Sequence, residues 1–316
     1  MTYDNRCLCC GKPLSGEDSY YHPKCAGKLF GSRSVSVLNR TQDELNALAK
    51  DTVLSRITVP GVQPKLSLHL ERGSSDSSAR LTLVGLEGDY ILKPQTPHWK
   101  NLPEAEHFCM MLAKECKIAT AEFGLIPLKS GELAYITRRM DRDGGRMLHM
   151  EDFCQILNKV TSQKYNGSME QIGKALRRYS DVPGLDAVRL FELAIFCFLT
   201  GNSDMHLKNF SLLRKENGAW ELSPAYDLVP VKIIMPADTE ELALTLNGKK
   251  NRLNRTDFEQ FAVSMNLTDI QCTRTLNRMR NNVEKNLASA LSASFLPEET
   301  KADIEVLVSE RISRIR

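Results

Sequence analysis

The sequence predicts an α+β protein with a small strand-rich part followed by a larger helical part, and three observations carry this prediction. Up to about residue 140, short apolar runs are separated by turn residues and interrupted by one amphipathic helical stretch. After residue 150, apolar residues recur at helical spacing over longer segments. Before both parts, four of the nine cysteines fall within the first 25 residues, which indicates a separate cysteine-rich extension.

Each expected element follows from a local pattern. Strands are expected at 57–59, 66–70, 81–86, 89–93, 123–128 and 133–138, with 81–86 and 89–93 paired as a hairpin around Gly85 and Gly88. Residues 44–49 show modest helical periodicity, and a helix is expected at 103–116, where Pro103 suits a first turn. Further helices are expected at 151–157, 169–179, 187–200 and from 257 almost to the end, with a short hairpin at 210–213 and 220–222.

We therefore predict three parts within the 316 residues: an extension at 1–31, an N-terminal lobe at 32–143 and a helical C-terminal lobe at 144–316. The net charge of +3 is too small to indicate a nucleic-acid-binding surface. The chain has no apolar run of the ~20 residues that span a bilayer. The first residues also lack the pattern of a signal peptide. These features predict a cytoplasmic protein that binds neither membrane nor nucleic acid directly.

The cysteine-rich extension has the spacing of a metal site. Cys7 and Cys10 form a Cys-x-x-Cys pair, and His22 and Cys25 form a His-x-x-Cys pair after eleven intervening residues. Two such pairs supply the four soft or borderline ligands of tetrahedral zinc, which in a closed site is structural. Cys9 is a spare thiol that could replace Cys7 or Cys10; a flexible tail without metal is the alternative. The other five cysteines lie in apolar helical patterns and are expected to be small buried hydrophobes: Cys109, Cys116, Cys154, Cys197 and Cys272.

The segment 201–210 carries the strongest chemical signal. Asp204 and Asn209 stand five positions apart, and Asp227 follows eighteen residues after Asn209. This order is typical of kinase-like sites, where the first Asp accepts the proton of the substrate hydroxyl and the Asn and second Asp bind Mg²⁺. The alternative is that these residues only form turns, as Asn and Asp often do.

Residues that could hold a nucleotide lie in the strand-rich part. Lys93 ends an apolar strand, from which a lysine can reach the α- and β-phosphates, although it could also be an ordinary strand-end lysine. Glu106 is the expected partner that orients Lys93, and Glu104 competes for this role. Residues 60–63 form a glycine-containing turn that could cover phosphates, and 137–142 follow the last strand of the lobe, where a hinge would contact adenine.

Taken together, these motifs resemble the HipA-like serine/threonine kinases, the toxins of bacterial toxin–antitoxin pairs. The resemblance covers about residues 56–230 in the order of the family. The matching segments are Gly61–Ser67, the strand ending at Lys93, Glu106–Ala113, Arg138–Arg142, Glu151–Gln155, Gly201–Phe210 and Pro224–Asp227.

The resemblance implies a bilobal protein-kinase-like fold that uses ATP and Mg²⁺. Carried over by position, Asp204 is the catalytic proton acceptor, and Asn209 and Asp227 bind Mg²⁺. The implied ATP contacts are Pro60, Gly61, Val62, Gln63, Pro64, Lys65, Lys93, Arg138, Arg139, Met140, His206, Leu207, Lys208, Asn209, Tyr226 and Asp227. From the residues alone, Lys208 could neutralise the γ-phosphate, and His206 could equally be a structural hydrogen bonder.

The resemblance also implies partners. The best-known substrates of such kinases are aminoacyl-tRNA synthetases, and their antitoxin carries a helix-turn-helix DNA-binding domain. Full-length members have a further N-terminal subdomain, whereas here about 55 residues precede the glycine-containing turn. The chain therefore resembles short members, whose missing subdomain is expected as a small separate protein.

Two positions depart from the family pattern. Thr58 stands where the family has its autophosphorylated serine, so Thr58 is the candidate for self-phosphorylation. A phosphate there would place negative charge beside those of ATP. Arg138 stands where several members have Glu, which leaves the adenine contacts open. Two other functions compete with a protein kinase: a phosphotransferase for a small molecule or lipid, and a non-catalytic, zinc-tethered binding module.

Overall fold

The chain folds into two compact units. The computed structural model describes residues 3, 5–15, 20–32, 38–54, 63–71, 80–84, 88–143 and 145–316. The first unit comprises Met1–Phe108, Ala121–Arg139 and Ala293–Leu296, and the second comprises Cys109–Thr120, Met140–Ser292 and Pro297–Arg316. The predicted boundaries at 31/32 and 143/144 stay a prediction.

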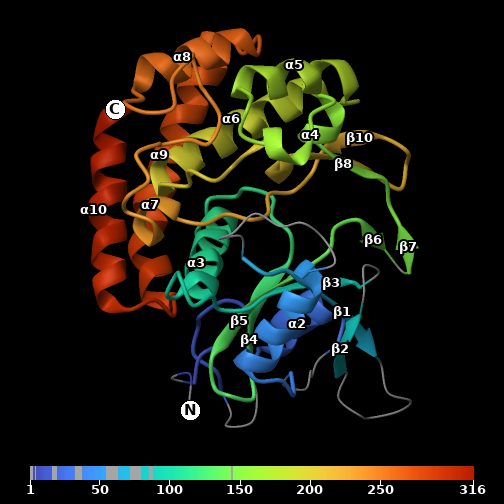
Figure 1. The fold of residues 1–316 in the computed structure, drawn as a ribbon. Coiled ribbons are helices and arrows are strands. Elements are labelled where there is room, and N and C mark those ends of the chain that lie inside the picture. The colour runs from blue at the N-terminus through green and yellow to red at the C-terminus, as the bar shows by residue number, and fades with distance from the viewer. Residues whose placement is uncertain are drawn as a thin grey trace. The chain divides into compact units, whose positions relative to one another are not determined.

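A five-stranded antiparallel sheet is the framework of the first unit (Figure 1). Its strands are β1 (Leu66–Glu71), β2 (Arg80–Val84), β3 (Tyr90–Lys93), β4 (Phe123–Pro127) and β5 (Leu133–Arg138), in the order β2-β1-β3-β5-β4. Along β1, Leu66, Leu68 and Leu70 are buried, as their alternation with polar residues predicts. In the register, Lys93 lies opposite Tyr135 at the end of β3.

The expected hairpin between 81–86 and 89–93 is wrong. Both strands form, but β1 lies between them, and each pairs with β1 in antiparallel fashion. Two strands that are both antiparallel to a third run parallel to each other, so no tight turn can join them. The alternating leucines of β1 make it a half-buried strand with two partners, and this position in the sheet is not visible in the local pattern.

Helices α1 (Pro23–Phe30) and α2 (Gln42–Leu54) belong to the same unit, together with the first part of α3 (Leu102–Glu115), up to Phe108. Helix α1 packs on β5, and Leu29 and Phe30 bury its apolar face. The N-terminal segment also joins the sheet through its backbone, since Leu125 N–H on β4 donates to Leu8 O at 2.8 Å. The extension is therefore part of this unit's core.

The second unit is mainly helical (Figure 1). Its helices are α4 (Phe153–Ile156), α5 (Met169–Tyr179), α6 (Pro183–Thr200), α7 (Val231–Ile234), α8 (Arg255–Ser264), α9 (Asp269–Ala293) and α10 (Glu298–Arg314). Helix α6 contacts α5, α10 and β10, and its residues from Leu193 to Thr200 are all buried. A helix that is apolar on every side belongs in a core, so α6 fixes the start of the segment 201–210.

Short strands complete the second unit. Strands β8 (Met150–Asp152), β9 (Ser211–Arg214) and β10 (Trp220–Leu222) form one sheet, and β6 (Arg142–Asp143) and β7 (Arg146–Met147) form a small ladder. The helix expected at 151–157 is shorter than predicted, because Glu151 pairs with Leu212 of β9. Asp152 then caps α4 by accepting from Gln155 N–H, and Asp152 N–H in turn donates to Oε1 of Gln155.

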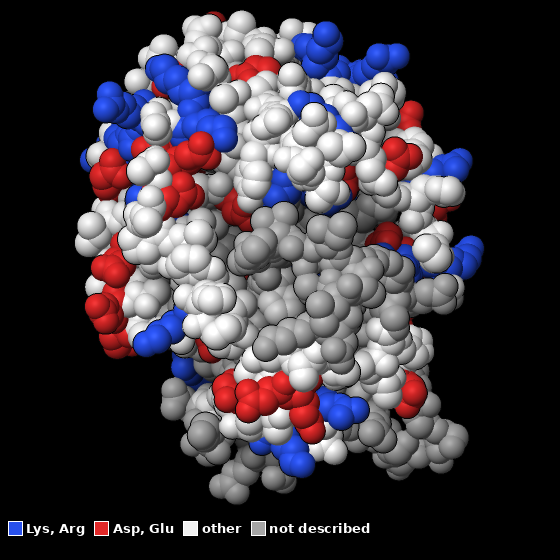
Figure 2. Space-filling view, viewed as in Figure 1, with Lys and Arg blue, Asp and Glu red and all other residues white. Residues whose placement is uncertain are grey.

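Charges of both signs are interspersed on the face shown in Figure 2, in keeping with the net charge of +3. All five cysteines expected to be small hydrophobes are buried. Within the described ranges, none of the helices is both long and apolar enough to cross a bilayer.

Candidate functional site

The segment 201–210 leaves α6 through a turn that requires glycine. Gly201 has φ +69°, a left-handed conformation that glycine adopts without strain. A Cβ on it would lie 2.6 Å from Cδ2 of Leu307, so a larger residue would also have to displace that side chain. Asn202 N–H then donates to Cys197 O at 2.8 Å, and Lys232 N–H donates to Gly201 O at 3.0 Å. The loop therefore begins from a fixed point at the end of a buried helix.

Hydrogen bonds within the loop join Asp204 to Asn209. Asn209 Nδ2 donates to the backbone oxygen of Asp204 at 3.0 Å, and His206 N–H donates to the same oxygen at 2.8 Å. Asp204 N–H in turn donates to Oδ1 of Asn202 at 3.2 Å. Because Nδ2 of the buried Asn209 is used within the loop, its Oδ1 is the atom left to act as a metal ligand.

The Asp204 carboxylate is half-buried and accepts a hydrogen bond from Tyr165 Oη at 2.6 Å. The Tyr165 ring meets the His206 ring edge-on, with centroids 5.1 Å apart. Burial, followed by the hydrogen bond to Asp204, raises the pKa of Tyr165, so its hydroxyl stays a donor at neutral pH. Tyr165 therefore orients one oxygen of the candidate base.

Lys208 is engaged by a residue outside the loop. Its Nζ lies 2.6 Å from Oδ2 of Asp152, the residue that caps α4. The ion pair with Asp152 holds the ammonium group, which stays partly exposed. It can therefore meet the negative charge of a phosphate.

Tyr226 joins the segment that carries Asp227 to the loop. Its hydroxyl donates to Lys208 O at 2.9 Å and lies 2.6 Å from Ser211 Oγ. Asp227 itself has φ +61°, a left-handed conformation that Asp tolerates better than most residues. A carboxylate held in such a backbone at the end of a cross-linked segment is typical of a functional position.

In the first unit, Lys93 and Glu106 form a buried ion pair. Lys93 Nζ lies 2.6 Å from Glu106 Oε1, and the two side chains are 4% and 0% exposed. The expectation that Glu106, not Glu104, partners Lys93 is confirmed. Lys93 Nζ also lies 5.4 Å from the centroid of the Tyr135 ring. Burying two charges is costly. A buried ion pair at the end of β3 therefore indicates a functional role for these two residues.

The other predicted nucleotide contacts are described in part. Thr58, Pro60, Gly61 and Val62 lie outside the described residues. Gln63 Nε2 donates to Pro94 O at 3.2 Å, which ties the segment before β1 to the residue after Lys93. Pro64 is half-buried and Lys65 is exposed, and both lie just before β1.

The predicted hinge residues span one of the points where the chain passes from the first unit to the second, between Arg139 and Met140. Arg138 N–H donates to Glu122 O and Arg139 N–H donates to Asp89 O, both at 2.8 Å. These two amides are therefore committed within the first unit, and an adenine contact by Arg138 or Arg139 would use a carbonyl oxygen or the side chain.

Cys7, Cys10, His22 and Cys25 come together as the sequence predicts. Their ligand atoms all lie within 4.8 Å of one another. Sγ of Cys10 lies 3.4 Å from Nδ1 of His22, while Nε2 of His22 lies 3.0 Å from Pro13 O. Nε2–H can thus donate to the carbonyl and leave Nδ1 for a metal, the usual arrangement of a histidine ligand. This cluster could hold a metal ion.

The backbone around this cluster is folded tightly. Gly11 N–H donates to Cys7 O at 2.8 Å, and Gly11 has φ +67°, with a Cβ on it falling 1.9 Å from Ala293 O. Hydrogen bonds from the Cys10 and Cys25 thiols lower the pKa of Cys7, so the neighbouring thiols favour the thiolate form of Cys7. Cys9 is outside the group of four, but its thiol shares a hydrogen bond with Cys7, and its Sγ lies 2.9 Å from where a Cβ of Gly124 would be.

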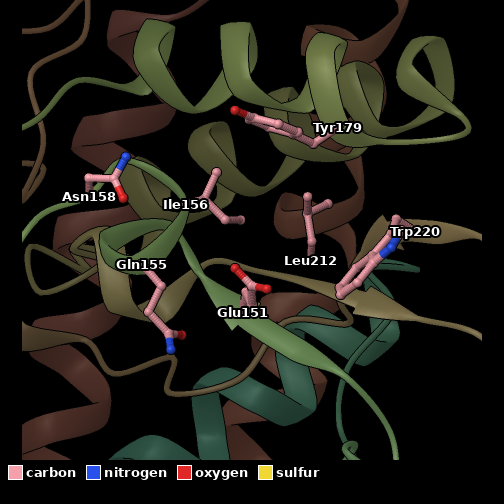
Figure 3. A pocket seen from close by; sticks show the side chains of 7 residues that line it. All are labelled: Glu151, Gln155, Ile156, Asn158, Tyr179, Leu212 and Trp220. Atoms are coloured by element: carbon pink, nitrogen blue, oxygen red, sulfur yellow. The ribbon is translucent and has the colours of Figure 1, made fainter.

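A surface hollow of about 410 Å³ lies on the second unit (Figure 3). It is lined by Glu151, Gln155, Ile156, Asn158, Tyr179, Leu212 and Trp220. Glu151 and Leu212 are register partners on β8 and β9. None of the residues predicted to bind ATP lines this hollow, so it is a feature separate from the loop 201–210.

Two contributors to the site were missed from the sequence. Tyr165 lies 39 residues from Asp204 in a polar stretch with no motif. Asp152 sits in the segment 151–155 that carries the family resemblance, but its role as the partner of Lys208 required the tertiary structure.

The mixed α/β fold resembles those of two solved structures. The structure superposes on Shewanella oneidensis HipA, from its complex with HipB and operator DNA, with a TM-score of 0.66 and 23% identity, covering 82% of this chain and 64% of that one. It also matches the Helicobacter pylori proinflammatory kinase CtkA, with a TM-score of 0.53 and 16% identity, over 78% and 93% of the two chains.

The chain belongs to the HipA-like C-terminal domain family, whose model matches residues 57–287. A Haemophilus influenzae protein named "Putative kinase" is 31% identical over 188 residues, which is 55% of this chain and 53% of that protein. The serine/threonine-protein kinase toxin HipA of Shewanella oneidensis is 30% identical over 217 residues, 61% and 47% of the two. The chain thus spans about half the length of these curated relatives.

Proposed function

We propose that this chain is an ATP- and Mg²⁺-dependent serine/threonine protein kinase of the HipA type. The observation that carries the proposal is the buried ion pair of Lys93 and Glu106 at 2.6 Å. Protein kinases need a lysine–glutamate pair of this kind in place, with the lysine on a strand and the glutamate on the following helix. Here the two residues lie on β3 and α3.

The proposed chemistry uses few groups. Asp204 accepts the proton of a substrate serine or threonine hydroxyl as that oxygen forms a bond to the γ-phosphorus and the bond from the γ-phosphorus to the oxygen of ADP breaks. Tyr165 holds Oδ1 of Asp204, so Oδ2 is the oxygen that receives the proton. Lys93 and Lys208 offset the negative charge of the phosphates.

The donor set near Asp204 fits Mg²⁺. Oδ1 of Asn209 and the carboxylate of Asp227 are hard oxygen ligands, and Mg²⁺ typically takes only one or two protein ligands beside phosphates and water. When bound, the ion would neutralise phosphate charge and orient the β- and γ-phosphates. Gln63, Pro64, Lys65, Arg138–Met140, His206, Leu207 and Tyr226 complete the proposed ATP contacts, together with Pro60–Val62.

The substrate and partners are proposed from the relatives. A HipA relative is named a serine/threonine-protein kinase toxin, and a structural neighbour is a complex with HipB and operator DNA. We therefore propose a toxin that phosphorylates a translation protein, such as an aminoacyl-tRNA synthetase. Its proposed partners are a helix-turn-helix antitoxin and a small N-subdomain protein, and Thr58 is the proposed site of autophosphorylation.

The ion proposed for the Cys7, Cys10, His22 and Cys25 cluster is Zn²⁺. Three thiolates and one imidazole make a tetrahedral donor set that suits zinc. With all four positions filled by protein, the site has no open position for chemistry and is structural.

Two alternatives compete with this function. The same loop would serve a phosphotransferase for a small molecule or lipid, and a fold can also persist as a non-catalytic binding module. The presence of Asp204, Asn209, Asp227 and Lys93 together favours catalysis over the second alternative.

The proposal is tested by inducing the wild-type chain and Asp204→Ala in cells and labelling the lysates with [γ-³²P]ATP. We expect the wild type to arrest growth and to label one discrete protein, and Asp204→Ala to do neither while still binding ATP. Label that appears only in small molecules would replace the protein-kinase function with the first alternative. Label in neither fraction would favour the second.

A further inference from the structure

Two adjacent residues of α3 connect different parts of the first unit. Glu106 accepts from Lys93 Nζ at 2.6 Å. His107, the next residue, has its Nε2 3.2 Å from the backbone oxygen of Cys9. Successive helical residues point about 100° apart, so α3 presents one side chain to β3 and the next to the cysteine loop.

His107 lies in an enclosed environment. The side chain is fully buried, and its ring packs edge-on to Phe123 at 5.6 Å and against Phe295 at 5.8 Å between centroids. Burial lowers the pKa of His107 to about 4, so the ring is neutral, and Nε2–H is the donor because Cys9 O can only accept. If either partner moved, this hydrogen bond would break and leave a buried polar group unpaired, which is costly.

The position of Cys9 O depends on the cluster. Cys9 lies between Cys7 and Cys10, two of the four residues that converge on the candidate ion. The same loop is closed by Gly11 N–H donating to Cys7 O. The loop also packs against 293–296, where Arg6 Nη1 donates to Ser294 O at 3.0 Å and its guanidinium lies 4.5 Å from the Phe295 centroid.

We propose that the metal ion bound by Cys7, Cys10, His22 and Cys25 holds α3 in place through the bond from His107 to Cys9 O, and thereby sets the Lys93–Glu106 pair. His107 is a positioning residue in this arrangement. The inference rests on the proposed role of Lys93 in ATP binding, and it gives the cysteine-rich extension a part in regulating that site: a chain without metal has a poorly formed nucleotide pocket.

The first test compares the full chain before and after metal removal with a chelator. Elemental analysis should find about one zinc per chain, as four ligands at one site require. We expect removal to speed amide hydrogen exchange across Leu102–Phe108 as well as in the cysteine loop. It should also weaken binding of a fluorescent ATP analogue about tenfold, equivalent to ~1.4 kcal/mol. Readdition of zinc should restore both.

The inference is wrong if metal removal opens only residues 5–31 and leaves exchange in α3 and analogue binding unchanged. It is also wrong if the purified chain holds no zinc and does not take it up. The control variant for the assignment of the four ligands is Cys9→Ala. Cys9→Ala keeps the Cys9 carbonyl and all four ligands, so it should keep the full zinc content.

Substitution of His107 separates positioning from folding. His107→Leu removes the donor but leaves the ligands, so zinc content should be retained while analogue binding weakens about fivefold, or ~1 kcal/mol. His107→Gln keeps an N–H donor and should recover most of that loss. Equal binding by wild type and a folded His107→Leu would overturn the inference. If His107→Leu does not fold, the chelation experiment decides.

These measurements do not require phosphate transfer. If the chain bound no ATP analogue at all, the proposed function would fail, while the exchange of α3 with and without zinc would still decide the coupling.

Discussion

Tyr165 donates its hydroxyl to Oδ1 of Asp204 at 2.6 Å across 39 residues of sequence. The bond fixes the rotamer of the proposed base and reserves Oδ2 for the substrate. Tyr165→Phe should therefore lower kcat by about tenfold, the effect of losing ~1.4 kcal/mol from one hydrogen bond to a charged group, and leave the KM for ATP unchanged. Steady-state transfer kinetics check this. An unchanged kcat would show that other contacts of the loop hold Asp204.

The Lys93–Glu106 pair allows stability to be separated from activity. Lys93→Met leaves Glu106 buried without its cation and should lower the free energy of unfolding by about 3–5 kcal/mol. The double variant Lys93→Met/Glu106→Gln removes both charges and should regain most of that stability while still failing to transfer phosphate. Denaturant unfolding measures the stability, and labelling measures phosphate transfer. The control is Lys129→Met, because Lys129 is exposed. A double variant that transfers phosphate at the wild-type rate would exclude Lys93 from the reaction.

Asp227 should act through its carboxylate and not through its backbone. Asp227→Asn keeps a residue that tolerates φ +61° and should unfold like the wild type, but it loses the negative charge that binds Mg²⁺. Asp227→Ala should additionally cost about 1 kcal/mol of stability because of left-handed strain. Calorimetric titration of Mg²⁺ into the chain with ATP measures the first effect. Mg²⁺ affinity that survives in Asp227→Asn would move the ligand elsewhere.

Glu104 gives the stability a pH dependence. Burial raises the pKa of Glu104 to about 7 from an ordinary 4.5, so folding favours its protonated form. The stability linked to this group is full below pH 4.5 and is lost as the pH rises through 7.

Glu104→Gln should therefore raise the free energy of unfolding by about 1–3 kcal/mol at pH 8 and by much less near pH 5. The exposed Glu132→Gln is the control, and urea unfolding at both pH values is the measurement. An equal gain at both values would contradict the shift.

Much of the fold was predictable because its elements have strong local patterns. The helix at 169–179 and the strand at 133–138 form as expected, since the helix has one apolar face of the correct period and the strand is a short, largely apolar run that is buried on both faces. The pairing of strands was less visible. The position of β1 between β2 and β3 is a long-range arrangement, and neither the loop length nor the alternation of residues encodes it.

The site shows the same division. Spacing predicted the four metal-ligand candidates, which converge within 4.8 Å, and the strand position of Lys93 predicted its glutamate partner. Tyr165, Asp152 and His107 could not be assigned roles, because each acts through a residue that is remote in sequence. The proposed roles of Asp204, Asn209 and Asp227 stay predictions.

The hydrogen bond from Leu125 N–H to Leu8 O has a consequence for solubility. β4 is the last strand of its sheet, and a last strand with free backbone groups invites pairing with another copy of the same chain. The N-terminal segment occupies one of those groups on β4, and Tyr21 Oη occupies the carbonyl of Leu125. Loss of the segment from this strand would thus expose a template for intermolecular sheet growth.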